Sequence, residues 1–353
     1  MDIDAEIRRL TLENKQGNKI KGCLFNLLVY TKDEIRGDFL RGVVQSIVQK
    51  LPCRLITVQS LSALNESLEI KVKQYGDGEI VCDHIAIKCP AREHEKIPFI
   101  VTPQFVPDLP VYIIWGDDPS QNFEVLKELI PYATRVIFDL ESVFEFKNYC
   151  PKVTSLLKEG HEVIDIPWAI LSSWREVFSK VFSSKESLKK LQNSTEIDIY
   201  FNAIDSNIEK RSSTNALYLS AWMTSSLEWE LKSVSCIKNV TCLDYDSDFG
   251  KRKIKLTPKK MDVMPQGAIV SIQVKNEPVE SFELVFKRGP DRVLVHVSSE
   301  DRCFLPLSLQ IRDLSKGLNF IQELLYSKTL LPYKKTMIEL EKLSQKEASI
   351  CEI

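Results

Sequence analysis

The sequence predicts an α/β N-terminal domain with a mixed, largely parallel sheet, followed by a smaller strand-rich α+β C-terminal domain. The chain has 353 residues, about twice the usual length of one domain. Apolar segments of strand length alternate with helical segments over residues 1–230, as in a parallel sheet covered by helices. Residues 1–230 hold 27 basic and 33 acidic residues, whereas residues 231–353 hold 20 and 16. We therefore expect two domains, 1–230 and 231–353, with a boundary near residues 230–250.

The first elements predict a β-α-β unit after a short lead-in helix over residues 2–14. Residues 23–30 form an almost unbroken apolar run, which suits a strand buried on both faces. A helix with Asp33 as its N-cap then follows, because apolar residues recur at every fourth position, namely Ile35, Phe39, Val43, Ile47 and Leu51. With a strand at residues 54–58, this order implies a parallel pair and a right-handed crossover.

The later elements follow the same alternation up to about residue 140 and then change. Gly76 and Gly78 predict a tight turn between strands 68–75 and 79–88. Further along, the first domain is expected to contain helix 92–105, strand 111–115, helix 123–130, strand 135–140, helix 165–182, strand 197–203 and helix 214–230. The second domain is expected to contain strands within 234–245, 269–274, 282–286 and 293–297, and helices 311–326 and 332–345.

Motifs argue against a bound cofactor or metal. The dinucleotide pattern G-x-G-x-x-G is absent, and the first expected strand-to-helix loop, residues 31–33, has no glycine to cradle a phosphate. His94 and His161 each begin an H-E-x-x-H pattern that lacks its second histidine. Residues 244–249 resemble the start of a calcium loop, but Phe249 stands at the sharp-turn position. We therefore predict no catalytic residues, no cofactor and no metal.

Charge and cysteine usage point to a cytoplasmic chain. The formal net charge is −2, which disfavours a nucleic-acid binder. The basic run at residues 251–260 is interpreted as a charged hairpin edge, with an anionic partner as the alternative. No export or membrane segment is visible. Nine cysteines occur without a C-x-x-C, and Cys236 and Cys242 are too far apart along one strand to pair, so we expect reduced thiols. Redox control through some of these thiols is a further hypothesis.

The tryptophans carry the clearest functional signal. Each of the five lies at the end of a predicted strand or on a predicted helix. One interpretation is core packing, since tryptophan usually buries most of its surface, and the other is a protein interface, where tryptophan and arginine are enriched. Trp174 and Arg175 are the best interface candidates. Neighbouring residues in a helix point about 100° apart, so only one of the two can occupy the centre of a buried stripe.

Six segments, in this order, resemble the OpcA family, the glucose-6-phosphate dehydrogenase assembly or effector proteins of bacteria. They are Phe25-Asn-Leu-Leu-Val-Tyr30, Pro52-Cys-Arg-Leu-Ile-Thr-Val58, Glu79-Ile-Val-Cys-Asp-His-Ile-Ala-Ile87, Pro107-Asp-Leu-Pro-Val-Tyr-Ile-Ile-Trp115, Asp165-Ile-Pro-Trp-Ala-Ile-Leu-Ser-Ser-Trp-Arg175 and Ala216-Leu-Tyr-Leu-Ser-Ala-Trp222. The resemblance covers residues 20–230, and residues 231–353 are more divergent.

The resemblance implies a non-catalytic assembly factor and allosteric activator of glucose-6-phosphate dehydrogenase in the oxidative pentose phosphate pathway. The dehydrogenase would be its partner, with neither nucleic acid nor membrane involved. The residues that match the family's segments are candidates for either partner binding or a signature core: Asp108, Pro110, Trp115, Asp165, Trp168, Trp174, Arg175 and Trp222. The alternative is a sugar-phosphate enzyme of the same pathway with an unrecognised active site.

Overall fold

The computed structural model describes residues 2–16, 20–32, 34–61, 67–75, 80–119, 123–143, 145–204, 211–276, 282–289, 292–299, 306–310, 318–326 and 331–351. The chain groups into two compact units, each described by itself. Unit 1 comprises Met1–Val143, Leu156–Ile166 and Leu324–Tyr326. Unit 2 comprises Phe144–Ser155, Pro167–Glu323 and Ser327–Ile353.

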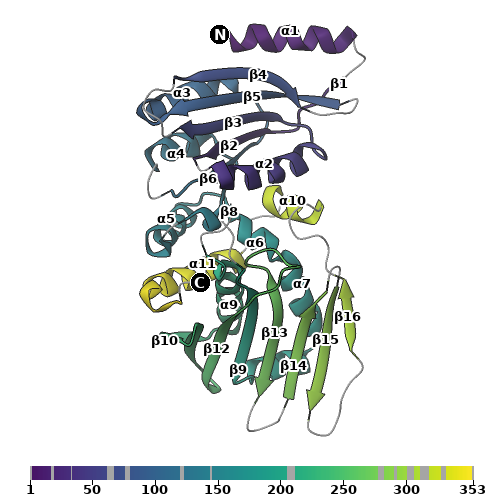
Figure 1. Ribbon diagram of the computed structural model, residues 1–353, viewed down its shortest axis with the longest axis vertical. Coiled ribbons are helices and arrows are strands. Elements are labelled where there is room, and N and C mark those ends of the chain that lie inside the picture. The colour runs from purple at the N-terminus through teal and green to yellow at the C-terminus, as the bar shows by residue number, and fades with distance from the viewer. Residues whose placement is uncertain are drawn as a thin grey trace. The chain divides into compact units, whose positions relative to one another are not determined.

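Unit 1 is built on a sheet whose strands run mostly parallel (Figure 1). The order is β1-β5-β3-β2-β6-β7-β8, and β4 pairs with β5 as an antiparallel edge strand. The predicted mixed, largely parallel sheet is confirmed. Its strands are β1 (Ile20–Lys21), β2 (Asn26–Thr31), β3 (Arg54–Leu61), β4 (Glu69–Tyr75), β5 (Ile80–Pro90), β6 (Val111–Gly116), β7 (Arg135–Phe138) and β8 (Val163–Asp165).

The helices of unit 1 bury apolar faces against this sheet. Between β2 and β3, α2 (Glu34–Val48) buries Leu40, Val43 and Ile47, of which Val43 and Ile47 belong to the predicted series of apolar residues. The predicted N-cap Asp33 lies outside the described residues. The other helical segments are α1 (Ile3–Gln16), η1 (Ala91–Lys96), α3 (Ile97–Val101), η2 (Thr102–Gln104), α4 (Phe123–Leu129), η3 (Ile130–Tyr132) and η4 (Leu140–Ser142). Two more helices, α5 (Phe146–Lys158) and α10 (Leu318–Leu325), contain residues of both units.

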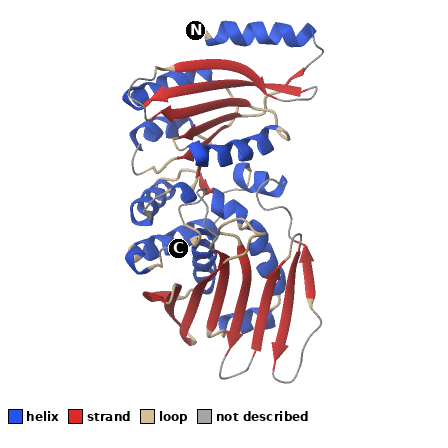
Figure 2. Cartoon of the chain, viewed as in Figure 1, coloured by secondary structure: helices blue, strands red, loops and turns tan. Residues whose placement is uncertain are grey.

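Unit 2 has a second, mixed sheet, whose strands are red in Figure 2. The strand order is β10-β11-β12-β9-β13-β14-β15-β16. Only the β9–β12 pair is parallel in this sheet, within the described strands. Its strands are β9 (Glu196–Asn202), β10 (Glu230–Ile237), β11 (Val240–Ser247), β12 (Gly250–Lys259), β13 (Ile269–Asn276), β14 (Phe282–Arg288), β15 (Arg292–Ser299) and β16 (Leu307–Gln310). The expected strand-rich C-terminal part is confirmed.

Helices pack on the sheet of unit 2 through aromatic and aliphatic side chains. Phe178 of α7 stacks on Phe286 of β14, with 4.6 Å between the ring centroids. The central helix α9 contacts both β9 and α11. The helical segments are α6 (Ile166–Ile170), α7 (Ser172–Val181), α8 (Lys185–Gln192), α9 (Thr214–Leu227), α11 (Leu331–Ser344) and η5 (Glu347–Ser349).

The second unit begins earlier in the sequence than the boundary expected near residues 230–250. The strand β9 and the helix α9, which the sequence assigns to the first domain, belong to unit 2. The cause is pairing at long sequence separation: β9 lies between β12 and β13 in one sheet. The first predicted domain therefore shares its last elements with the second sheet.

Three local predictions need correction. The alternating segment 234–245 is not one strand but the hairpin β10–β11, turned by Lys238 and Asn239 with φ of 52° and 63°. The helix predicted over 165–182 is two helices, α6 and α7, which meet at Leu171. The basic run 251–260 is not a sheet edge, because β12 lies between β11 and β9. Its lysines face acidic residues, with Lys253 Nζ 3.6 Å from Asp244 Oδ1.

The expectation of reduced thiols throughout is wrong at one pair. A disulfide joins Cys236 in β10 to Cys351, 115 residues later in the sequence. The spacing argument considered only near neighbours along one strand, whereas the fold brings the C-terminal residues to β10. The described cysteines outside this disulfide are Cys23, Cys53, Cys82, Cys89, Cys150 and Cys242, and Cys303 lies outside the described residues.

Within the described residues, no helix is both long and apolar enough to cross a membrane.

Candidate functional site

The strand order of unit 1 fixes where a ligand would be expected. The chain leaves β2 toward β3 on one side and later returns to β6 on its other side. In open α/β sheets ligands bind at such a switch point, outside the carboxyl ends of the strands. The carboxyl ends of β2 and β6 are therefore the first place to look for a functional site.

Two stacked aromatic rings fill this switch point. Tyr30 and Trp115 are register partners near the ends of β2 and β6, and their rings stack in parallel with 4.0 Å between centroids. Both are almost fully buried, at 1% and 0% exposure. Next to them, a Cβ on Gly116 would lie 2.1 Å from Leu40 Cδ1 of α2, so the helix packs directly on the strand end. The position is a packed core.

The residues present do not fit a dinucleotide. In that type of site a glycine-rich turn lets the first helix N-terminus approach a pyrophosphate. Here β2 ends at Thr31 and α2 begins at Glu34, and the two residues between them include no glycine. The Tyr30–Trp115 stack occupies the adjoining space. No reaction step is therefore derived through such a cofactor.

A serine–histidine pair lies beside the stack. Ser60 at the end of β3 is 2.7 Å from His94 Nε2 in η1, and the edge of His94 faces Tyr30 at 6.2 Å between centroids. Burial and the nearby Lys32 lower the pKa of His94, against an opposing effect of Asp117. A neutral histidine can accept a proton from a serine, but Ser60 is only 4% exposed. The pair is placed to tie η1 to the sheet.

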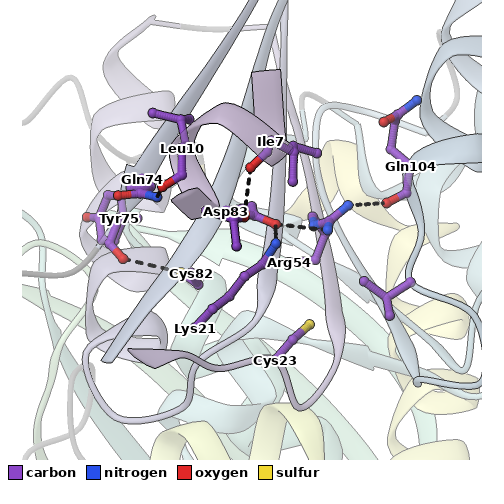
Figure 3. A network of polar contacts seen from close by, with 12 residues as sticks. Ile7, Leu10, Lys21, Cys23, Arg54, Gln74, Tyr75, Cys82, Asp83 and Gln104 are labelled. Carbon is purple, nitrogen blue, oxygen red and sulfur yellow. Dashed lines mark hydrogen bonds and ion pairs between the residues drawn. The ribbon is translucent and has the colours of Figure 1, made fainter. Parts of the chain in front are cut away.

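A buried ion cluster joins three strands of unit 1 (Figure 3). The Asp83 carboxylate in β5 is 2.6 Å from Lys21 Nζ of β1 and 2.8 Å from Arg54 Nη2 of β3. Arg54 also donates to the Gln104 carbonyl at 3.1 Å. Asp83 is 3% exposed, so its charge depends on these two cations. The cluster holds β1, β3 and β5 together at the start of β3.

In unit 2, Arg175 is the centre of a compact cluster. Its guanidinium lies over the Trp168 ring at 3.5 Å and donates to the Trp168 carbonyl at 2.5 Å and to Glu323 Oε1 at 2.8 Å. Burial lowers the pKa of Arg175 to about 10, and Glu323 partly offsets the effect. Tyr333 of α11 packs its ring edge near Trp168. The arginine thus fastens α7 to α6 and to Glu323.

The eight predicted residues are divided between the two units. Asp108, Pro110, Trp115 and Asp165 belong to unit 1, whereas Trp168, Trp174, Arg175 and Trp222 belong to unit 2. These residues also differ in how far their side chains are exposed.

Four of these residues are buried: Trp115, Asp165, Trp168 and Trp174. Asp165 accepts a hydrogen bond from the Leu140 backbone N–H at 3.0 Å. Asp108 and Pro110 are exposed, and Trp222 is partly exposed and lines a pocket of about 340 Å³ with Phe182 and Leu188. Burial favours a core for these four residues, Arg175 is partly buried in the cluster around Trp168, and Asp108, Pro110 and Trp222 are left for contact.

Sequence reasoning missed Asn26, which positions the exposed turn that carries Asp108 and Pro110. Its side chain donates to the Val106 carbonyl at 3.0 Å and accepts from the Val106 N–H at 2.7 Å. Asp108 itself has a positive φ of 61°. The sequence contained a signal for this role, namely an asparagine at the start of an apolar strand. Such an asparagine, when fully buried, needs polar partners. Asp83, inside an alternating strand, gives the same signal.

The chain is similar to a known family over its first part. The family model described as "Glucose-6-phosphate dehydrogenase subunit N-terminal domain" matches residues 44–153. A Synechocystis protein (strain ATCC 27184 / PCC 6803 / Kazusa) named "Putative OxPP cycle protein OpcA" is 22% identical over 201 residues, 55% of this chain and 41% of that protein. A Nostoc punctiforme protein of the same name is 24% identical over 195 residues, 53% of this chain and 40% of that protein. The match thus spans about two fifths of the length of these relatives.

Solved structures resemble the whole chain in fold. A 3-ketoreductase from Actinomadura kijaniata superposes with a TM-score of 0.55 at 8% identity and covers 92% of this chain and 97% of that chain. An NAD-binding oxidoreductase from Klebsiella pneumoniae gives 0.54 at 8% identity over 92% and 96%. At such low identity these likenesses concern the fold alone, which is Rossmann-like. The OpcA resemblance is confirmed: residues 44–153 match the N-terminal domain of this glucose-6-phosphate dehydrogenase assembly family.

Proposed function

We propose that this chain is a non-catalytic partner of glucose-6-phosphate dehydrogenase, which promotes assembly of the dehydrogenase and activates it in the oxidative pentose phosphate pathway. The observation that carries this proposal is the match of residues 44–153 to the dehydrogenase-subunit family. The names of the curated relatives, which refer to the same pathway, add support. A cytoplasmic location is part of the proposal.

The filled switch point supports a role without catalysis. The place where this fold class usually holds a ligand contains the Tyr30–Trp115 stack and the close contact between Gly116 and Leu40. Among the described residues, no group of histidine, cysteine and acidic side chains is arranged to hold a metal. A protein that acts by contact needs a stable folded surface, and the packed interior supplies one.

Activation by such a partner has a simple thermodynamic requirement. The chain must bind the active dehydrogenase state more tightly than the inactive state, since equal affinity shifts no equilibrium. A coupling free energy of about 1 to 3 kcal/mol changes the equilibrium roughly 5- to 150-fold. A modest difference between two interfaces is therefore sufficient.

For partner contact we propose, in each unit separately, the three predicted residues that lie outside the buried core and outside the Arg175 cluster. Asp108 and Pro110 lie on the turn held by Asn26, and Trp222 lines the apolar pocket of unit 2. Tryptophan is enriched at interface hot spots, because it supplies a large contact area with little loss of entropy. Trp222 is thus the residue whose truncation should weaken the partner contact most.

The test uses the full chain and purified glucose-6-phosphate dehydrogenase. Size-exclusion co-elution and initial rates of NADPH formation are measured with the wild-type chain and with Trp222→Ala. We expect a complex and a raised rate for the wild type, and at least about tenfold weaker binding for the variant. Phe249→Ala, at an exposed aromatic in the β11–β12 turn, is the matched control and should behave as wild type. Unchanged kinetics without a complex would refute the proposal.

The alternative, a sugar-phosphate enzyme, is examined in the same experiment. The fold likeness to oxidoreductases gives it little support, because a shared fold does not imply a shared activity. The chain alone is incubated with glucose 6-phosphate, 6-phosphogluconate and either nicotinamide cofactor. Turnover without added dehydrogenase would favour the enzyme over the assembly factor.

A further inference from the structure

A concave site lies on unit 1 on the α2 side of the sheet, and Thr31 and Leu40, which adjoin Gly116 at the switch point, are among its lining residues. A pocket of about 530 Å³ opens along the outer edge of α2, over the sheet face formed by β3, β5 and β4. This volume falls within the usual range for small-molecule sites, roughly 300 to 1,000 Å³. The family match and the proposed function assign nothing to it.

The pocket has an apolar floor and a polar wall. Leu55, Val29 and Val44 form part of the floor. On the wall, Thr57 Oγ1 is 2.9 Å from His84 Nε2, and Tyr75 presents its ring edge to His84 at 6.0 Å between centroids. Gln45 and Gln59 also line the wall. Such a combination suits a ligand with a carbon skeleton and several hydroxyl groups.

The imidazole of His84 has a defined protonation state at neutral pH. Burial lowers the pKa of His84 to about 4, and the neighbouring Lys73 contributes to the effect. At neutral pH the ring is therefore uncharged, so one nitrogen donates and the other accepts. Together with Thr57 it offers both kinds of hydrogen-bonding atom without adding charge.

The positive charge of the site comes from its rim. Arg41 lines the pocket, and Lys73 and Lys88 lie on the same sheet face as His84 by strand register. Arg41 pairs with Asp38, but both side chains are more than 60% exposed, so this pair is weak and an anion can compete for it. Among the described residues, the charged side chains at the pocket or on this face of β4 and β5 are Asp38 and Arg41 of α2 and Glu69, Lys71, Lys73 and Lys88, four cations and two anions.

We propose that this pocket binds a small phosphorylated sugar, with its phosphate at Arg41 and its hydroxyl groups toward Thr57, His84 and Gln59. The proposal rests on the pocket alone and stands or falls independently of the dehydrogenase, because binding is measured with this chain by itself. An arginine guanidinium is well suited to phosphate, since its planar fork can donate two hydrogen bonds.

Gly42 provides a way to close the pocket without disturbing the core. It lines the pocket, and a Cβ built on it would meet nothing within 4 Å. Gly42→Leu therefore places bulk in the opening, whereas Gly42→Ala adds one methyl group in free space. For charge, Arg41→Gln is matched by Arg9→Gln, because Arg9 also pairs with an acidic residue three positions earlier on an exposed helix.

The experiment is isothermal titration calorimetry of the full chain with glucose 6-phosphate, glucose and inorganic phosphate as separate probes. We expect saturable 1:1 binding of glucose 6-phosphate that exceeds the binding of either half-probe. Gly42→Leu should abolish it, and Arg41→Gln should weaken it about tenfold. Gly42→Ala and Arg9→Gln should bind as wild type, and circular dichroism melting confirms that every variant is folded.

Three results would overturn the proposal. The first is a lack of saturable binding of glucose 6-phosphate to the wild-type chain. The second is binding that survives Gly42→Leu in a folded variant, which would place the ligand elsewhere. The third is equal affinity for inorganic phosphate and glucose 6-phosphate, which would reveal an anion site without sugar recognition. None of these results depends on whether the chain activates a dehydrogenase.

Discussion

At the scale of single residues, His84 couples stability to pH. Its pKa is about 4 in the folded chain, because it is buried beside Lys73, against an ordinary value of 6.5. Between these values the unfolded chain binds a proton that the folded chain does not. The stability linked to His84 is therefore complete above about pH 6.5 and is lost as the pH falls to about 4.

The first prediction follows from this difference. His84→Gln should reduce the loss of unfolding free energy between pH 7 and pH 4 by up to about 3 kcal/mol, since each pKa unit corresponds to about 1.4 kcal/mol. Urea unfolding at several pH values measures the effect. If the variant and the wild type lose the same free energy over this range, the assigned pKa of His84 is wrong.

Arg175 is the residue that best separates a structural role from a docking role. Removing its guanidinium would leave Glu323 and the Trp168 carbonyl without their partner inside unit 2. We predict that Arg175→Gln lowers the unfolding free energy by about 3 kcal/mol, whereas Glu176→Gln, which loses only an exposed pair with Lys180, changes it by less than about 1 kcal/mol. Chemical denaturation measures both. A stable Arg175→Gln chain that no longer binds dehydrogenase would instead make Arg175 a contact residue.

At the scale of elements, the Asp83 cluster should decide how firmly the edge of the first sheet is held. Asp83→Asn would leave the cations of Lys21 and Arg54 without their shared carboxylate. We predict a loss of about 3 to 5 kcal/mol. Glu69→Gln, from an exposed pair with Lys71, is the control and should cost less than about 1 kcal/mol. Hydrogen exchange of β1 and β5 would show whether the loss is local, and wild-type protection in Asp83→Asn would contradict the assignment.

Local patterns were sufficient to predict most of these elements. The spacing of apolar residues in α2 and the unbroken apolar run of β2 lead directly to the parallel β2–β3 pair. The β10–β11 hairpin was hidden because its turn uses Lys238 and Asn239 at positive φ, where a glycine would have signalled the turn. The break at Leu171 was hidden because the apolar stripe continues across it.

At the scale of the whole molecule, the Cys236–Cys351 disulfide closes a loop of 115 residues in unit 2. A cross-link over so long a loop restricts the unfolded chain strongly, in the loop-entropy description by about 4 to 5 kcal/mol. We predict that Cys236→Ser lowers the melting temperature of the oxidised protein and makes it insensitive to dithiothreitol. Cys242→Ser, at a free cysteine, is the control and should keep the sensitivity. A wild-type melting temperature that ignores dithiothreitol would contradict the prediction.

Local sequence patterns do not predict how the chain divides into units or which residues come together in a site. Nothing near β9 in the sequence shows that it pairs with β12 and β13, more than fifty residues later. The predicted site residues were chosen by resemblance, and half of them prove to be buried because the segments shared with the family include core strands and helices. The pocket beside α2 was not foreseen, because its wall combines Thr57, Tyr75 and His84 from three strands.

The stacked Tyr30 and Trp115 rings limit how a nucleotide site could be engineered at the switch point. Truncating Trp115 to alanine would leave a void walled by the Tyr30 ring. Apolar voids of this kind remain dry and take up xenon or benzene in preference to charged molecules. Emptying the crevice would therefore create a gas-binding hole and not a nucleotide site. A pyrophosphate would also require a new glycine-bearing turn between β2 and α2.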